Sequence, residues 1–172
     1  MTLFYSFLRW FYGIIEVDKK YDGGWKMYFV DQKHIKETLK FIDDILMELD
    51  QYKYESFIEK FALERMTQLI IESIIDVGNM MIDGFIMRDP GSYEDIIDIL
   101  VDEEVLPESE SDDYKDVIGL REMLVKDYLN IDDDRLKKTI LTKKNVVDEF
   151  GTHIRNYLKK ESEVAHAFSN DK

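Results

Sequence analysis

The sequence contains no cysteine and only two prolines and three histidines among its 172 residues. Without cysteine the chain can form neither disulfide bonds nor thiolate metal sites. The histidines, His34, His153 and His166, stand at no spacing typical of metal ligands. We therefore expect no metal or other cofactor, and the absence of cysteine suits a reducing cytoplasm.

The sequence also lacks the motifs of several common enzyme classes. It has no glycine-rich phosphate loop and no Ser-His-Asp arrangement. The apolar N-terminal stretch, residues 1–15, is too short to span a bilayer and is interrupted by Arg9. It has neither the basic start nor the small-residue cleavage site of a secretory signal. We therefore predict no membrane partner.

The N-terminal segment, residues 1–26, precedes the first helical pattern. Gly23 and Gly24 can be encoded by a ribosome-binding sequence placed just before a start codon at Met27. One hypothesis is that translation begins at Met27 and that residues 1–26 come from an upstream start. The alternative is a genuine hydrophobic extension that packs on a dimer or on a membrane surface. We expect residues 27–160 to form one helical domain and residues 161–172, which lose periodicity, to fray.

Positive charge is scarce, with 23 basic against 37 acidic residues and a net charge of −14. This balance disfavours indiscriminate nucleic-acid binding, because phosphate neutralisation by lysine and arginine supplies most non-specific affinity. Residues 89–118 hold 12 acidic residues and one lysine, whereas residues 133–160 hold eight basic residues and four acidic ones. We expect residues 102–113 to form a solvated acidic loop. The basic region is either a solvated face or a limited stripe that binds RNA or a partner.

Hydrophobic residues make up 45% of the chain, enough for a core within a single domain. They recur at helical spacings, and no strand alternation occurs. The sequence therefore predicts an all-α antiparallel bundle of about five helices. The expected elements are a helix capped by Asp31, a long helix from Ser56 to about Asp83 that Gly84 ends, a short helix after Ser92, a helix over residues 119–128, and a final helix from Asp132 or Asp133 that nothing interrupts except Gly151.

The most informative stretch is residues 119–128, an amphipathic run that carries Arg121, Lys126 and Tyr128. On a continuous helix Arg121 and Tyr128 would nearly superpose on one face, whereas Lys126 would lie about 140° away from Arg121. The three side chains can converge only if the helix ends near Lys126 or if a second copy of the chain contributes. This geometry favours a homodimer.

The predicted long helix is apolar on more than one side, as expected if it contacts both the bundle and a second subunit. A stripe of five polar residues runs along it: Arg65, Gln68, Glu72, Asp76 and Asn79. Because buried polar groups need partners, we expect Arg121 and Tyr128 to lie in a cleft beside this stripe, with Glu72 or Asp76 orienting the guanidinium. The alternative is a stripe open to solvent. Gly78, which costs about 1 kcal/mol relative to alanine, suggests that another backbone packs closely there.

Arg121, Lys126 and Tyr128 together resemble the motif of the HEPN superfamily and of its HepT-like toxins, in which an arginine is followed after four to six residues by His-x-Tyr. Residues of the preceding long helix also match the HepT-like pattern, namely Glu64, Arg65, Gln68, Glu72 and the run from Asp76 to Asn79. The order and spacing of both blocks carry the resemblance, which covers residues 27–158.

The resemblance implies a dimeric, metal-independent endoribonuclease from a toxin-antitoxin pair, inhibited by a nucleotidyltransferase-type antitoxin. The motif residues of both subunits would line one cleft. In such a site a base takes the proton of the ribose 2′-hydroxyl and a cation stabilises the phosphorane, roles suited to the family's histidine and arginine. By this resemblance Arg121 is the cation, and Tyr128 is the acceptor of AMP groups added by the antitoxin.

Lys126 departs from the family pattern, because it stands where the histidine is expected. A lysine, with a reference pKa of about 10.4, is a poor general base at neutral pH unless it is strongly desolvated. Two hypotheses therefore remain. The chain is either a weak or lapsed HepT-type ribonuclease with Arg121, Lys126 and Tyr128 at its catalytic site, or a non-catalytic HEPN dimer that binds a protein or nucleotide partner.

Overall fold

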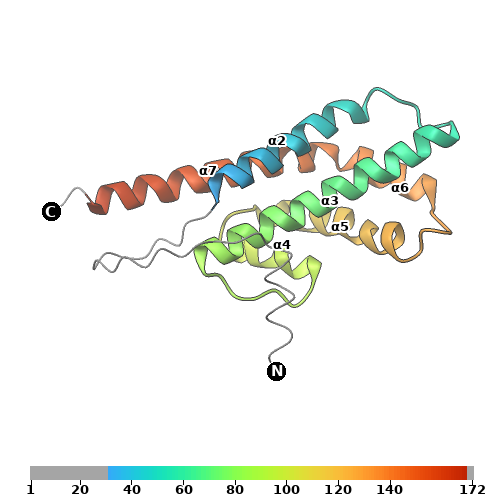
Figure 1. The fold of residues 1–172 in the computed structure, drawn as a ribbon. Helices are drawn as coiled ribbons and strands as arrows, with labels where there is room; N and C mark the ends of the chain where they lie inside the picture. Colours follow the sequence, from blue (N-terminus) through green and yellow to red (C-terminus); the bar gives the residue numbers. More distant parts are fainter. Residues whose placement is uncertain (1–30, 170–172) are drawn as a thin grey trace, which may run out of the picture.

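The computed structural model describes residues 31–169, which form six α-helices and one short 3₁₀-helix without any strand (Figure 1). In chain order these are α2 (Gln32–Leu49), α3 (Phe57–Phe85), α4 (Tyr93–Asp102), η1 (Glu108–Glu110), α5 (Ser111–Val125), α6 (Asp133–Thr142) and α7 (Lys144–Ser169). The all-α class is confirmed, but this part of the chain holds six helices rather than five. The hypothesis about the start of translation concerns residues outside the described part.

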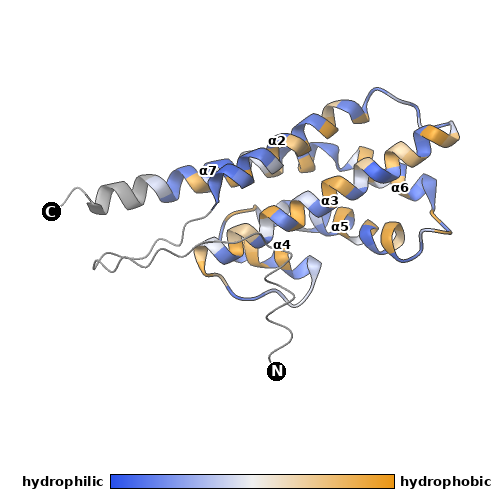
Figure 2. Ribbon diagram, viewed as in Figure 1, coloured by the Kyte–Doolittle hydropathy of each residue, from blue (hydrophilic) through white to orange (hydrophobic). Residues whose placement is uncertain are grey.

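The long helix α3 is the centre of the bundle. It packs against α2, α4, α5 and α6, while α2 also packs against α7 (Figure 1). In Figure 2 apolar and polar residues alternate along the helices, and the apolar ones supply the buried core. Nearly every turn of α3 from Leu63 to Ile82 contributes a buried side chain. Among residues 31–169, no helix is both long and apolar enough to cross a membrane.

The predicted starts of the helices are confirmed, because capping depends on residues that are neighbours in sequence. Asp31 accepts a hydrogen bond from the backbone N–H of His34 at 3.0 Å and begins α2. The capping box of α3 is complete: Ser56 Oγ accepts from the N–H of Glu59, and the Glu59 carboxylate accepts from the N–H of Ser56. Ser92 caps α4 in the same way.

The expected end of α3 at Gly84 is wrong. The helix continues to Phe85, whose ring packs edge-on against Tyr157 of α7 with 5.1 Å between ring centroids. Ile86 then adopts the left-handed conformation (φ 56°), and its N–H bonds to the carbonyl of Ile82. The contact between Phe85 of α3 and Tyr157 of α7 thus stabilises a helix end that the local preference for glycine does not predict.

The expectation of one final helix is also wrong. The helix is interrupted at Lys143, between α6 and α7, whereas Gly151 lies buried inside α7. The first part, α6, packs against α3 and α5, and α7 packs against α2 and α5, so the two helices share α5 but differ in their second neighbour. The Lys143 ammonium is paired with Asp113 and Asp116 of α5, which holds the break in place.

The carboxylates of the acidic segment 102–113 mostly face water, as predicted, but the segment is not simply a solvated loop. Val105 and Leu106 are buried, and both of their N–H groups bond to the carbonyl of Leu100. The segment ends in η1, and α5 begins at Ser111. Two apolar residues thus anchor the segment to the core, although charge dominates its composition.

Three of the eight basic residues in 133–160 pair with acidic residues of the same chain. Lys144 pairs with Asp50, and Arg155 Nη2 lies 2.7 Å from Asp43 Oδ2 on α2. Lys143 is also paired to α5, so three cations of this region form ion pairs within the fold. These contacts favour the structural interpretation of the basic stripe over the RNA-binding one.

Candidate functional site

Arg121 projects from α5 towards α3 and is held there by Glu72 of the polar stripe. Its Nε donates to Glu72 Oε1 at 2.9 Å, and its Nη2 lies 3.5 Å from Glu72 Oε2. Both side chains are part-buried. A guanidinium and a carboxylate that meet edge to edge form charged hydrogen bonds with a preferred geometry. This pair therefore fixes the orientation of the Arg121 side chain.

The same guanidinium lies over the ring of Tyr93, the first residue of α4, with 4.3 Å from Cζ to the ring centroid. This distance is well within the range of about 6 Å for a cation-π contact. Arg121 therefore has two partners at once, the carboxylate of Glu72 at Nε and Nη2 and the aromatic ring of Tyr93 at Cζ.

A hollow of about 630 Å³ opens beside Arg121 between α3, α4 and α5. Its lining is mixed in chemistry: Asn79, Pro90, Gly91, Ser92, Tyr93, Glu94, Ile96, Ile118, Gly119, Arg121, Glu122 and Lys126. Two cations, Arg121 and Lys126, reach this hollow from one chain. In a protein with a net charge of −14, such a pair is the best candidate for holding an anion.

Lys126 lines the hollow from the end of α5. It is the C-cap residue, and it keeps a right-handed helical backbone whose N–H bonds to the carbonyl of Glu122. Its side chain is 70% exposed, and its Nζ lies 3.3 Å from Glu122 Oε1. Arg121 and Lys126 therefore line one hollow within a single chain, although they do not share a helix face.

Tyr128 does not share the helix face of Arg121, and the geometric argument that joined them is wrong. The helix has already ended, and Tyr128 lies in the connection between α5 and α6 with 65% of its surface exposed. It is not among the residues that line the hollow. Within the described part of the chain its hydroxyl makes no hydrogen bond.

The polar stripe divides into three parts along α3. Arg65 and Gln68 bond to each other at 3.0 Å on the exposed surface, and Glu72 holds Arg121. Asn79 lines the hollow. The stripe is thus solvent-facing at one end and part of the candidate site at the other.

Asp76, the remaining member of the stripe, lies at the surface on the side of α2. Crowding by protein atoms and, second, the negative charge of Glu72 raise the pKa of Asp76, while His34 of α2 acts in the opposite direction. Asp76 does not line the hollow.

Gly78 marks a close approach, but to a side chain rather than to a backbone. A Cβ at this position would lie 2.4 Å from Cγ2 of Ile96 on α4. This contact seats α4 on α3 and so places Tyr93, almost one turn earlier on α4, beside Arg121. The expectation of a neighbouring backbone at Gly78 is corrected accordingly.

The segment before α4 was not recognised as part of a site from the sequence. Arg88 holds Asp95 with two hydrogen bonds of 2.8 and 2.6 Å, and the N–H of Gly91 donates to the same carboxylate at 2.7 Å. The bonds from Arg88, and then the one from Gly91, lower the pKa of Asp95 to about 2. Local sequence indicated the cap at Ser92 but gave no sign that Tyr93 meets Arg121.

A second hollow, of about 560 Å³, lies between the end of α4 and α7 and includes His153. His153 Nε2 lies 3.1 Å from Glu110 Oε2, which also accepts from the hydroxyl of the buried Tyr114 at 3.0 Å. These bonds tie η1, α5 and α7 together. Among the described side chains, no group of three or more histidine, cysteine or carboxylate residues could hold a metal ion.

A model of the family described as ribonuclease HepT-like matches residues 35–154. This chain belongs to the HepT-like family. The match spans α2 to the middle of α7 and includes Glu72, Arg121, Lys126 and Tyr128. The resemblance to this family is therefore confirmed.

This HepT-like chain is similar to the putative RNase YutE of Bacillus subtilis, with 47% identity over 143 residues that cover 83% of the chain and 99% of that protein. A solved structure of YutE, described as a cytosolic protein of unknown function, matches with a TM-score of 0.77 and 48% identity, covering 78% of this chain and 95% of the other. A toxin-antitoxin structure with AMP-PNP matches at 20% identity with a TM-score of 0.63, covering 70% and 96% of the two chains. At that identity the likeness concerns the fold.

Proposed function

We propose that this chain is a weak or lapsed HepT-type ribonuclease that acts as a homodimer and binds RNA phosphate through Arg121 and Lys126. The observation that carries the proposal is that these two cations line one hollow of a strongly acidic chain. The chain's membership of the HepT-like family supports it. The cytosolic description of YutE and the lack of cysteine are consistent with action in the cytoplasm.

The reaction that suits this site is metal-independent cleavage of RNA by its own 2′-hydroxyl. The 2′-oxygen gives up its proton to a base or to water and attacks the adjacent phosphorus, the 5′-oxygen leaves and takes up a proton, and a 2′,3′-cyclic phosphate remains. Arg121 suits the stabilisation of the phosphorane, because Glu72 and Tyr93 hold it in advance and little reorganisation is needed. Lys126 would hold a neighbouring phosphate in competition with Glu122.

Weak activity follows from the position of Lys126. A lysine becomes a general base when burial removes it from water. The Lys126 side chain is largely exposed and paired with Glu122, so no such burial occurs. This observation also favours the second function, a non-catalytic dimer that binds a protein or nucleotide partner through the same surface.

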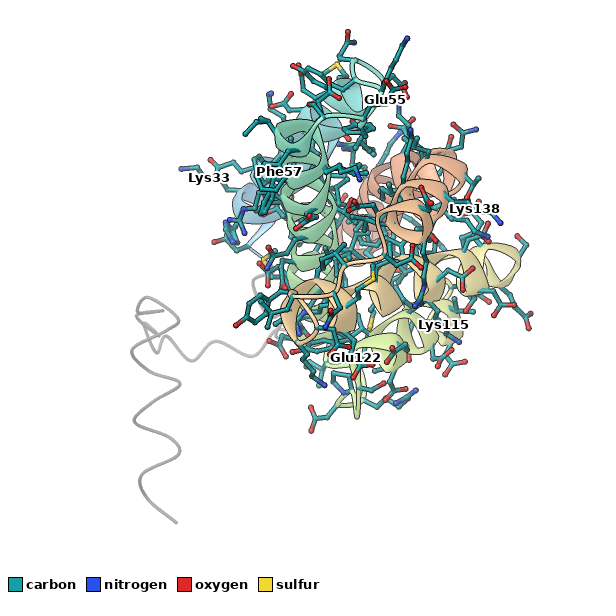
Figure 3. The ribbon with its side chains drawn as sticks, turned by 90° about the vertical axis from the view of Figure 1, so that its right-hand side faces the viewer. Lys33, Glu55, Phe57, Lys115, Glu122 and Lys138 are labelled. Carbon is teal, nitrogen blue, oxygen red and sulfur yellow. The ribbon has the colours of Figure 1, made fainter. Side chains whose placement is uncertain are left out.

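A homodimer is supported by apolar side chains that the chain itself leaves uncovered. Phe57, Ile58 and Phe61 are exposed on the first turns of α3, with the rings of Phe57 and Phe61 4.7 Å apart. Figure 3, in which Phe57 is labelled, looks at the molecule from this end. Exposed clusters of large apolar residues often mark protein interfaces.

Tyr128 is the proposed acceptor for AMP from a nucleotidyltransferase-type antitoxin. Its exposed hydroxyl, free of hydrogen bonds to the described residues, suits attack on the α-phosphorus of ATP with release of pyrophosphate. Co-expression with the neighbouring nucleotidyltransferase, where one is encoded, should add the mass of one AMP group. Tyr128→Phe should abolish this addition and Tyr93→Phe should not; an AMP-modified Tyr128→Phe protein would contradict the assignment.

The test of the main proposal is expression from a tightly controlled promoter with and without Arg121→Ala, followed by growth and RNA integrity. We expect weak RNA damage or slowed growth that Arg121→Ala removes. The control is Arg65→Ala, because Arg65 lies on the same polar stripe but outside the hollow. If the protein and Arg121→Ala behave identically and neither binds RNA in vitro, the partner-binding function replaces the ribonuclease.

A further inference from the structure

Tyr93 stands out among the residues around the hollow because it lies outside the motif of Arg121, Lys126 and Tyr128, yet it touches the central cation. Its ring lies under the Arg121 guanidinium at 4.3 Å. It also lines the hollow, and 45% of its surface is exposed. An aromatic residue with that much exposure and a cation on its face is not needed to fill the core.

The two contacts of Arg121 constrain different motions. Glu72 fixes one edge of the guanidinium through Nε and Nη2, but a hydrogen-bonded edge still allows the plane to rotate about it. The ring of Tyr93 lies 4.3 Å from Cζ, and the attraction between cation and ring, together with the space the ring occupies, opposes that rotation. The remaining nitrogen, Nη1, makes no hydrogen bond to the described residues and is available to an anionic oxygen.

Tyr93 is itself held by a short network that precedes α4. Ser92 Oγ accepts from the N–H of Asp95 at 3.1 Å, and the Asp95 carboxylate is bound by Arg88 and by the N–H of Gly91. On the other side, Ile96 packs closely on Gly78 of α3. The first residue of α4 therefore sits on a rigid support rather than on a free loop.

We propose that Tyr93 is a positioning residue, which holds the Arg121 guanidinium against Glu72 so that the Nη1 edge faces a phosphate in the hollow. The inference rests on the proposed function for the identity of the anion. The positioning itself is a property of the free protein and can be tested without RNA.

The test compares Tyr93→Phe, which keeps the aromatic face, with Tyr93→Leu, which removes it. The first readout is the solvent exchange rate of the Arg121 Nε–H proton by NMR in the free protein. The second is the affinity for a short single-stranded RNA with 2′-O-methyl groups, which cannot be cleaved. The matched control is Tyr52→Leu, because Tyr52 is 48% exposed and lies outside the hollow.

We expect Tyr93→Leu to speed exchange of the Arg121 proton and to weaken RNA binding about two- to five-fold, the effect of losing an exposed cation-π contact. Tyr93→Phe and Tyr52→Leu should match the unmodified protein in both readouts. Unchanged exchange in Tyr93→Leu overturns the inference, whether or not RNA binding falls, because Tyr93 would then act on RNA directly or not at all. Equal losses in Tyr93→Phe and Tyr93→Leu also overturn it.

These outcomes are separable from failure of the proposed function. If Arg121→Ala leaves RNA binding unchanged, the hollow does not bind RNA through Arg121 and the proposed function fails. The exchange readout still decides whether Tyr93 positions Arg121.

Discussion

Arg121 and Lys126 share one hollow but differ in how strongly the protein constrains their side chains. Arg121 is part-buried between Glu72 and Tyr93, whereas Lys126 reaches the hollow from a helix end with most of its surface in water. Stabilisation of charge in a transition state benefits from groups that are held in advance. The site thus retains a well-placed cation and lacks a well-placed base.

At the residue scale we predict that Lys126→His increases RNA cleavage. An imidazole titrates near neutral pH and can take the 2′-proton, and a general base typically contributes about a hundred- to ten-thousand-fold. Cleavage of a labelled RNA by purified protein in the presence of a chelator measures the gain. The double variant with Arg121→Ala should lose it. A different outcome, in which the unmodified protein already cleaves RNA with a pH profile that depends on Lys126, would require a desolvated lysine base instead.

At the scale of elements, the site depends on how α4 is seated on α3. Gly78 lets Ile96 approach α3, and the network of Arg88, Gly91 and Asp95 fixes the start of α4. Neither feature involves Arg121 or Lys126, the two cations of the hollow, but both determine the position of Tyr93. The two predictions that follow test each feature separately.

Gly78→Ala should destabilise the protein even though alanine favours helix by about 1 kcal/mol. The added Cβ would meet Ile96, a β-branched side chain with little freedom to move, and such overpacking costs about 1–3 kcal/mol. The matched control is Gly119→Ala on α5, where nothing lies within 4 Å, and which should stabilise by about 1 kcal/mol. Urea unfolding at equal protein concentration measures both. If Gly78→Ala stabilises the protein while Ile96 is left unchanged, the close packing of Ile96 on Gly78 is refuted.

The Arg88–Asp95 network should stabilise the protein only above acidic pH. Because the folded-state pKa of Asp95 is lowered from 3.8 to about 2, its contribution is present above pH 3.8 and is lost as the pH falls towards 2. Asp95→Asn should therefore lower Tm relative to the unmodified protein near neutral pH, and the difference should shrink through this acidic window. Asp83→Asn, at an aspartate without an ion pair to the described residues, is the control. A Tm difference that stays constant from neutral pH down to about 2 would show that the charge of Asp95 is not the cause.

At the scale of the whole molecule, the exposed apolar cluster lies at one end of α3 and the hollow nearer to the other. Ile58 and Ile86 bracket this helix with similar exposures of 73% and 70%, yet only Ile58 belongs to the cluster with Phe57 and Phe61. These two isoleucines allow a matched test of the proposed homodimer.

Ile58→Asp should dissociate the dimer, because a charge in an apolar interface must be desolvated without a partner. Aspartate in the first turn of a helix is favourable, so α3 itself should remain intact. Ile86→Asp, at the far end, should leave the dimer unchanged, since aspartate tolerates the left-handed conformation found there. Light scattering at micromolar concentrations reads the mass. A monomeric unmodified protein, or a dimer that survives Ile58→Asp, contradicts this interface.

The sequence by itself determined the all-α class and the starts of α2, α3, α4 and α6. Helix periodicity and capping involve residues within one or two turns of each other, so they can be read locally. Asp31, Ser56, Ser92 and Asp132 each accept the backbone N–H that their positions predict. The motif also pointed to Arg121 and to the polar stripe that supplies Glu72.

Only the tertiary structure decided where the helices end and which side chains meet. Phe85 continues α3 past Gly84 and packs against Tyr157 of α7. The final helical run is divided at Lys143, so that α6 packs on α3 while α7 packs on α2. Because α5 ends at Val125, Tyr128 lies outside the hollow that Arg121 and Lys126 line. Tyr93 of α4 contacts Arg121 of α5, although the acidic segment separates these two helices in the sequence. Such contacts join residues far apart in the chain, and their energies are not encoded in local spacing.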